Sequence, residues 1–235
     1  MTQIQENLTK ILSKIRDVEK RAFRAENSVK LVAVSKFHPA ESVIEAMNAG
    51  QNLFGENRIQ EAAAKFDEIR AKGFNPNLHI IGSLQRNKVK EAVRIASCIE
   101  SVDRIELIEE IEKQAAKIGK NIEILFEVHT GEESKAGFTS ESDLENAISR
   151  CAAGDFPHIV PRGFMTMAPF TDDKNLIRES FVTLRTLREK FQKNFPNLDL
   201  CELSMGMSGD FEIAIAEGST EVRIGTAIFG KREYV

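Results

Sequence analysis

Cysteine is scarce in this sequence, which contains only Cys98, Cys151 and Cys201 among 235 residues. The three are widely separated, and no CxxC pair occurs. An odd number without paired spacing argues against both a disulfide framework and a cysteine-based zinc site. We therefore expect these thiols to be small buried groups in a reducing compartment.

Long apolar runs are also absent, since no stretch approaches the roughly 20 consecutive apolar residues that cross a bilayer. Apolar side chains between residues 4 and 18 recur at helical spacing, and Thr2 and Gln5 are placed for a capping box. This pattern predicts an amphipathic helix and not a signal peptide. We therefore expect a cytoplasmic protein without a membrane partner.

No block of basic residues stands out either. Lys and Arg total 32 and Asp and Glu total 36, for a net charge of -4, and the two signs are interspersed. Such a chain has no basic stripe to neutralise a phosphate backbone, so nucleic acid is not an expected partner. Hydrophobic residues at 42% and charged residues at 29% are typical of a soluble globular domain.

Short β-rich runs alternate with longer helical patterns after the first helix, which is typical of βα units around a parallel sheet. Eight is the closure number of the TIM barrel. We therefore predict an α/β fold, a single TIM-type (β/α)8 barrel preceded by an N-terminal helix. The predicted strands are residues 31–34, 52–55, 78–82, 98–102, 123–128, 163–166, 200–204 and 222–225.

No linker or low-complexity tract divides the chain. Residues 1–235 are predicted to form one domain, with residues 1–25 as a helix packed on it. An open doubly wound sheet is the structural alternative. It is less favoured because no GxGxxG follows the first strand, and the glycine-rich segments come after the seventh and eighth.

Lys36 follows the first predicted strand, LVAV. Period-two alternation places it on the same face as Val32 and Val34. If that face lines the barrel, partial desolvation favours the neutral amine that attacks a carbonyl. The alternative is a solvated lysine that has left the strand, and the local sequence does not decide between the two.

Small and hydroxyl-bearing residues follow the last two strands, from Ser204 to Gly209 and at Gly225 and Thr226. Glycines let backbone N–H groups approach a phosphate closely, and loops after strands seven and eight often bind phosphate in this fold. The alternative is that the glycines only make tight turns. Arg223 shares a strand face with Gly225, so it should point inward, where it needs an acceptor such as a ligand ring nitrogen or an internal carboxylate.

Eight blocks, in order along the chain, resemble the YggS/PROSC family of pyridoxal phosphate homeostasis proteins. One such block could occur by chance, but eight collinear blocks are specific. The resemblance implies a barrel like the N-terminal domain of alanine racemase. The blocks are LVAVSK at 31–36, FGENRIQEA at 54–62, HIIGSLQRNK at 79–88, SVDR at 101–104, GEESKAGF at 131–138, GFMTMAP at 163–169, LSMGMSGD at 203–210 and VRIGTAIFGKREY at 222–234.

The resemblance also implies a cofactor, pyridoxal 5′-phosphate, and ten residues that contact it. Lys36 would hold the cofactor as a Schiff base, and Arg223 would face the pyridine nitrogen. The phosphate would be bound by Ser204, Gly225 and Thr226. The full set is Lys36, Asn57, His79, Ser83, Ser204, Met205, Gly206, Arg223, Gly225 and Thr226.

Three further positions are compared with the family pattern. Lys135 matches a family lysine near the site that is associated with transfer or regulation. Leu78 stands where the family usually has Trp, which should alter packing only, and His129 replaces an Asn at the entry rim. The implied partners are pyridoxal phosphate and the apo-enzymes that would receive it, and we expect a monomer.

A carrier role is favoured over catalysis. A guanidinium opposite the ring nitrogen keeps its proton, so Arg223 would weaken the electron sink that drives pyridoxal phosphate chemistry. Racemisation also needs an acid or base on each face of the substrate carbanion. The only tyrosine, Tyr234, is penultimate and should pack the tail, which leaves His38 or His129 as the second base.

We therefore predict a protein of pyridoxal phosphate homeostasis and delivery without strong catalytic activity. The main alternative is a low-activity amino-acid racemase of the alanine racemase type. A class I aldolase is less favoured because its lysine usually lies on a later strand, whereas Lys36 follows the first. A barrel that binds protein partners without a ligand is the remaining possibility.

Overall fold

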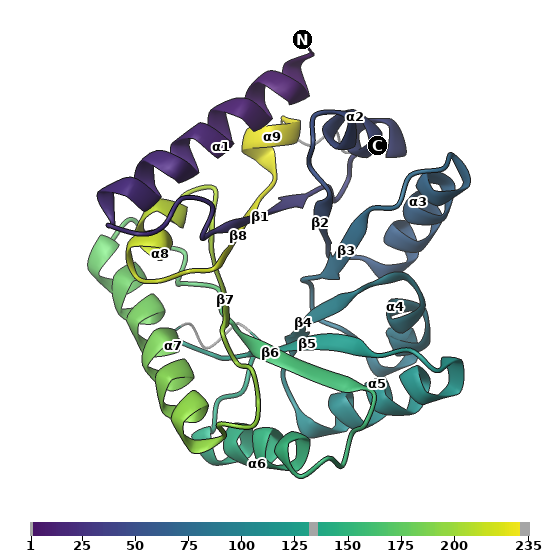
Figure 1. The fold of residues 1–235 in the computed structure, drawn as a ribbon, viewed down its shortest axis with the longest axis vertical. Helices are drawn as coiled ribbons and strands as arrows, with labels where there is room; N and C mark the ends of the chain where they lie inside the picture. The colour runs from purple at the N-terminus through teal and green to yellow at the C-terminus, as the bar shows by residue number, and fades with distance from the viewer. Residues whose placement is uncertain (1, 132–135, 231–235) are drawn as a thin grey trace.

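Eight parallel strands form a closed barrel in the computed structural model, which describes residues 2–131 and 136–230 (Figure 1). The strands pair in sequence order, and β8 pairs with β1 to close the sheet. The predicted TIM-type barrel and all eight predicted strands are therefore confirmed. The strands are β1 (Lys30–Val34), β2 (Leu53–Glu56), β3 (Asn77–Ile80), β4 (Cys98–Val102), β5 (Ile122–Glu127), β6 (Ile159–Met165), β7 (Glu202–Met207) and β8 (Glu221–Ile224).

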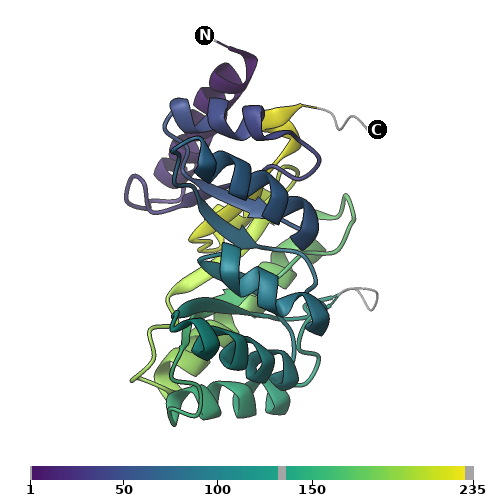
Figure 2. The same cartoon turned by 90° about the vertical axis from the view of Figure 1, so that its right-hand side faces the viewer.

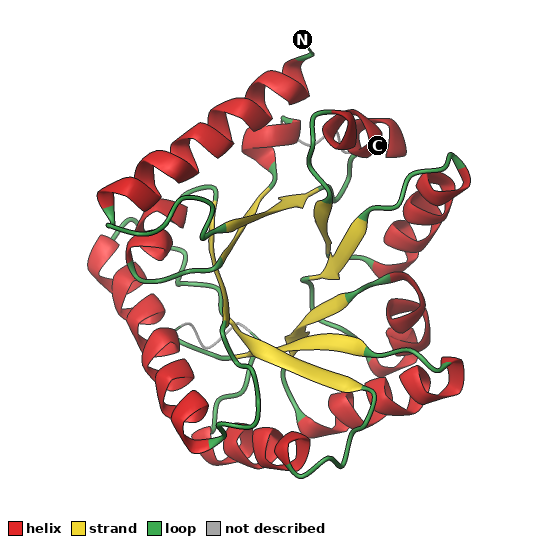
Figure 3. Ribbon diagram, viewed as in Figure 1, coloured by secondary structure: helices red, strands yellow, loops and turns green. Residues whose placement is uncertain are grey.

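Helices surround the barrel on its outside (Figure 3). Within the described residues, none of them is both long enough and apolar enough to span a membrane. The helices are α1 (Gln3–Arg21), α2 (Ala40–Asn48), α3 (Ile59–Ala71), α4 (Val89–Ile95), α5 (Ile105–Ile118), α6 (Glu141–Ala152), α7 (Lys174–Asn194), α8 (Phe211–Ala216) and α9 (Thr226–Phe229), with a short 3-10 helix at Arg86–Lys88.

The main hydrophobic core lies between the sheet and the helices. Leu31 and Ala33 of β1 belong to this core, whereas the equally buried Val32 and Val34 do not. Alternate residues of a strand point to opposite faces, so Val32 and Val34 face the barrel interior. This alternation is what aims Lys36, two residues further on, at the carboxyl end of the barrel.

Helix α1 begins with the predicted capping box, in which Thr2 Oγ1 accepts from Gln5 N–H and Gln5 Oε1 accepts from Thr2 N–H. The helix packs against α2, α8 and α9. Asn7 Nδ2 donates to the Ile228 carbonyl at 3.0 Å, and Arg24 donates to the Ser219 carbonyl at 2.6 Å. The N-terminal helix therefore covers the seam where the last strand meets the first.

The two ends of the barrel differ in what surrounds them. Figure 2 shows the barrel from the side, with the green loop between β6 and α7 projecting on the right. The yellow-green turn between α7 and β7 lies on the opposite side. In a parallel barrel all strands run the same way, so every loop that follows a strand emerges at the carboxyl end.

Strand β6 begins four residues before the predicted start and carries a bulge. Its Pro161 pairs with Ile124, and its Gly163 pairs with Leu125, so Arg162 is an extra residue. Proline has no N–H to donate to a ladder, and Pro161 lies beside the bulge, where a ladder hydrogen bond can be missing.

Strand β7 also carries a bulge and continues three residues beyond the predicted end. Ser204 pairs with Glu221 and Met207 pairs with Arg223, so β7 uses one residue more than β8. Gly206 has φ +97°, and a Cβ there would lie 2.5 Å from the Ala214 Cβ. Only glycine fits this conformation and close approach, and the bulge turns Met207 toward the barrel mouth.

Candidate functional site

A cavity of about 260 Å³ lies at the carboxyl end of the barrel. Two basic side chains, Lys36 and Arg223, line it, and no carboxylate of the described chain does. The cavity is therefore suited to a small anionic ligand. Its lining residues are Val34, Lys36, His38, Asn57, Ile81, Met167, Met207, Ser208, Gly209, Arg223, Gly225 and Thr226.

Five of the ten predicted contact residues lie on this cavity: Lys36, Asn57, Arg223, Gly225 and Thr226. Lys36 and Gly225 are far apart in sequence, but β1 and β8 are hydrogen-bonded neighbours. Gly225 packs so tightly on β1 that a Cβ would lie 2.8 Å from the Val34 carbonyl oxygen. Closure of the barrel is thus what brings the lysine beside the last loop.

The turn that carries Lys36 rests on a buried ion pair. Lys65 Nζ of α3 lies 2.8 Å from Glu56 Oε1 and donates to the Ser35 carbonyl at 2.9 Å. Ser35 Oγ donates to the same Glu56 oxygen at 2.7 Å. Burial raises the pKa of Glu56, while Lys65 and Ser35 oppose this shift. The residue before Lys36 is therefore held at both its carbonyl and its hydroxyl group.

The residue after Lys36 is held as well. Phe37 has φ +66°, which is unusual for a residue with a side chain. Its N–H donates to Glu61 Oε1 at 2.8 Å, and the Arg58 guanidinium lies 4.8 Å from the centre of its ring. These contacts fix the backbone on both sides of the lysine, so its side chain starts from a defined position.

Asn57 follows β2 and presents an unsatisfied oxygen. Its Oδ1 is buried and has no hydrogen-bond partner among the described residues. Gly82 packs against the Asn57 backbone, where a Cβ would lie 2.7 Å from the Asn57 Cα. Leaving a buried acceptor unpaired costs about 1–3 kcal/mol. A donor on a bound ligand would remove this cost.

Arg223 forms the floor of the cavity and is almost fully buried. Its NH1 donates to Ser204 Oγ at 2.7 Å, and its NH2 donates to the Thr166 carbonyl at 2.7 Å. Glu100 Oε2 lies 3.9 Å from NH1. A guanidinium has five N–H donors, so these bonds orient the group without using all of them.

The other five predicted contacts do not line the cavity. Ser204 donates to Glu100 Oε2 at 2.5 Å in the barrel interior, and His79 Nδ1 lies 2.7 Å from Glu100 Oε1. Met205 is buried in the outer core, because it alternates with Ser204. Gly206 makes the bulge that packs on α8. Ser83 is exposed and lies away from the cavity lining.

Several lining residues were not among the predicted contacts, notably Met207, Ser208 and Gly209. Ser208 and Gly209 belong to the glycine-rich loop that the sequence singled out, but the β7 bulge shifts the cavity-facing positions toward the end of that loop. Lys135 and Tyr234 fall outside the described residues. His129 is partly buried and is not a lining residue.

Comparisons with known proteins identify the family of this chain. The family described as "Alanine racemase, N-terminal domain" matches residues 7–233. A pyridoxal phosphate homeostasis protein of Aquifex aeolicus is 39% identical, over 97% of this chain and 98% of its own length. The Escherichia coli protein of the same name is 33% identical, over 100% of this chain and 99% of its own.

Solved structures give the same picture. PipY of Synechococcus elongatus, determined with pyridoxal phosphate bound, has a TM-score of 0.86 at 36% identity, covering 97% of this chain and 100% of that one. Alanine racemase of Clostridium difficile has a TM-score of 0.74 but only 15% identity, and the match covers 58% of it. That second likeness shows the fold alone.

Proposed function

Because the chain belongs to the family of pyridoxal phosphate homeostasis proteins, we propose that it binds pyridoxal 5′-phosphate beside Lys36 and stores and delivers it. The observation that carries the proposal is that Lys36, Arg223 and the loops after β7 and β8 share one cavity without a carboxylate lining. The donors there match the groups of this cofactor, an aldehyde, a ring nitrogen and a phosphate.

Lys36 is the proposed covalent attachment point. Its uncharged Nζ would add to the aldehyde carbon and form a C=N bond, and the aldehyde oxygen would leave as water. The unpaired Asn57 Oδ1 accepts a hydrogen bond from the ligand. Both residues are on short segments whose backbone is held by neighbouring contacts, so the attachment site is preorganised.

The phosphate is assigned to Ser208, Gly209, Gly225 and Thr226, which lie together on the cavity wall. This assignment replaces Ser204, whose hydroxyl already donates to Glu100 and accepts from Arg223. Hydroxyl groups and glycine N–H groups are suitable donors to phosphate oxygens. Gly209 has open space where a Cβ would be, so a ligand can approach its backbone.

Arg223 supports storage over catalysis. It lies on the cavity and is assigned to the ring nitrogen, to which a guanidinium donates a hydrogen bond without giving up its proton. An unprotonated ring is a weak electron sink. The relatives at 33–39% identity are named homeostasis proteins, whereas the racemase at 15% identity shares only the fold.

The decisive experiment is the absorption spectrum of the protein after incubation with pyridoxal phosphate, beside the spectrum of Lys36→Ala. We expect the band of a lysine-linked chromophore in the wild type and its loss in the variant. Lys90→Ala, which removes an exposed lysine of α4, is the matched control and should keep the band. An unchanged band in Lys36→Ala would refute the attachment site.

Delivery needs a separate test. The loaded protein is mixed with an apo-aminotransferase while a phosphatase destroys free pyridoxal phosphate, and recovered transaminase activity is followed. Direct transfer predicts recovery despite the phosphatase, whereas release into solution predicts none. An optical-rotation assay with L-alanine checks the racemase alternative, for which His38 on the cavity wall would be the second base. We expect no sustained racemisation.

A further inference from the structure

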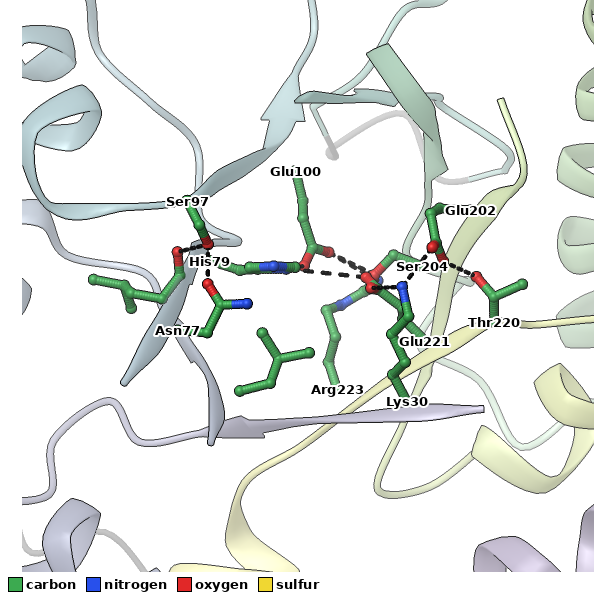
Figure 4. Close-up of polar contacts among 12 residues, drawn as sticks. Lys30, Asn77, His79, Ser97, Glu100, Glu202, Ser204, Thr220, Glu221 and Arg223 are labelled. Atoms are coloured by element: carbon green, nitrogen blue, oxygen red, sulfur yellow. Dashed lines mark hydrogen bonds and ion pairs between the residues drawn. The ribbon is translucent and has the colours of Figure 1, made fainter. Parts of the chain in front are cut away.

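A second polar cluster lies deeper in the barrel, toward the amino ends of the strands. Figure 4 shows His79 of β3, Glu100 of β4 and Glu221 of β8 pointing toward one another. Their exposed fractions are only 6%, 0% and 3%. Glu221 lies two residues before Arg223 on the same strand face, so the cluster is one layer below the cavity of Lys36.

The three side chains bring three ligand atoms together. His79 Nδ1 lies 2.7 Å from Glu100 Oε1 and 4.0 Å from Glu221 Oε2. One atom from each residue falls within 4.8 Å of the other two. Ligand atoms of a zinc site are about 2.0–2.2 Å from the ion. Small side-chain adjustments would therefore place all three around one ion.

In each carboxylate, one oxygen contacts a residue outside the cluster and the other oxygen points toward the imidazole of His79. Glu221 Oε1 is 3.4 Å from Lys30 Nζ, and Glu100 Oε2 accepts from Ser204 Oγ at 2.5 Å. Glu221 Oε2 is buried and has no hydrogen-bond partner in the described part of the chain. The buried Oε2 of Glu221 therefore leaves one acceptor position open beside His79 and Glu100.

The local charge balance supports the same conclusion. Three carboxylates, those of Glu100, Glu202 and Glu221, face the permanent cations Lys30 and Arg223, which leaves a negative charge when His79 is neutral. A bound cation would therefore offset the net negative charge of this part of the barrel interior.

Solvent can reach the cluster from the amino end. A cavity of about 380 Å³ opens there and is lined by His79 and Glu221, together with Lys30, Cys98 and Glu123. It is separate from the cavity of Lys36, with which it shares no lining residue. The cavity provides an entry path for an ion and a water molecule for a fourth coordination position.

We propose that His79, Glu100 and Glu221 bind one divalent first-row transition-metal ion, of which Zn²⁺ is the best match. One imidazole nitrogen and two carboxylate oxygens form a borderline ligand set that suits zinc better than calcium or magnesium. Three protein ligands leave the fourth position to water from the amino-end cavity. The site does not depend on the proposed cofactor, because none of the three residues lines the cavity of Lys36.

The test is a Zn²⁺ titration by calorimetry of the full chain after chelator treatment. We expect one ion per chain in the wild type and at least about tenfold weaker binding in Glu221→Gln. Glu123→Gln is the matched control, because Glu123 lines the same cavity but pairs with Arg162, so it should bind as the wild type does. Absence of binding by the wild type, or equal binding by Glu221→Gln, would overturn the proposal.

A second measurement needs no variant. The chain has four histidines, His38, His79, His129 and His158, whose ring signals can be followed by NMR during Zn²⁺ addition. The proposal predicts shifts of the His79 ring at one equivalent, and it fails if His79 does not respond. Lys36→Ala should bind Zn²⁺ as the wild type does, which separates this site from the cofactor site.

Discussion

The two ends of the barrel interior are both polar, but they carry opposite charge. At the carboxyl end, Lys36 and Arg223 line a cavity to which no carboxylate of the described residues contributes. At the amino end, Glu202 and Glu221 line the cavity with Lys30 and His79. Strand β8 supplies Arg223 to one end and Glu221 to the other. One strand therefore contributes a cation to the end that attracts anions and a carboxylate to the end that attracts cations.

The substitution with the largest expected effect is Arg223→Met, because this side chain joins the two ends. It removes a cation beside Glu100 and the bonds to Ser204 and the Thr166 carbonyl. Breaking a buried ion pair costs about 3–5 kcal/mol, so the free energy of unfolding in urea should fall by that amount. Arg162→Met, which breaks exposed pairs, should cost under about 1 kcal/mol. Equal losses of stability in the two variants would contradict the proposal that Arg223 connects the two ends of the barrel.

Lys65→Met should affect the carboxyl end alone. Glu56 loses its buried partner, and the Ser35 carbonyl loses a donor, so we expect unfolding to become about 3 kcal/mol easier and pyridoxal phosphate to bind more weakly. Urea denaturation and the absorbance titration measure the two effects. The double variant with Glu56→Gln should regain part of the stability, because no unpaired charge remains buried. Lys72→Met, which breaks exposed pairs, is the control.

The pH dependence of the free energy of unfolding can be compared for one buried carboxyl group at each end of the barrel. Burial and the nearby Asp103 raise the pKa of Glu127, the last residue of β5, to about 7. The folded chain then holds a proton that the unfolded chain has lost, so this group's contribution to stability falls as pH rises from 4.5 through 7. Glu127→Gln should gain about 1–3 kcal/mol on the wild type between pH 5 and pH 8.

Glu221→Gln is the corresponding substitution at the amino end. The pKa of Glu221 is also raised to about 7, so in metal-free protein Glu221→Gln should flatten the pH profile in the same direction. Urea unfolding at several pH values in the presence of a chelator compares the two variants. A gain for either variant that shrinks toward pH 8 would show that its carboxyl group is not the cause.

Gly206→Ala should act only on the loop after β7. The φ of +97° and the 2.5 Å approach to the Ala214 Cβ together should cost about 1–3 kcal/mol and displace Met207. Gly154→Ala is the control, since Gly154 has φ +85° but nothing within 4 Å of a Cβ. Thermal unfolding of the two variants separates the cost of the steric contact from the cost of the backbone conformation. Equal losses of stability in the two variants would show that the contact with Ala214 contributes nothing.

Much of the fold could be predicted from sequence, because alternation within strands and helical spacing between them are local signals. The bulges in β6 and β7 could not. Each adds one residue to one strand, and only the pairing with a neighbour reveals it. The β7 bulge alone moves the cavity contact from Gly206 to Met207.

The sequence predicts which side chains of the site point into the barrel, but it does not predict how far each lies from the mouth. His79 and Ile81 both follow the inward alternation of β3, yet only Ile81 reaches the cavity, and His79 lies one layer deeper. Ser204 and Glu221 are deep in the same way. Sequence period tells which way a side chain points, whereas its distance from the mouth depends on the stagger between strands, which is a property of the closed barrel.

Closure by pairing β1 with β8 also has a consequence for how the chain is made. Leu31 of β1 must pair with Val222 of β8, and α1 must pack on α8 and α9. Almost two hundred residues separate these partners along the chain. During synthesis the edge of β1 that pairs with β8 stays unpaired until β8 has left the ribosome. A nascent chain arrested before β8 would therefore present an open sheet edge that is prone to aggregation.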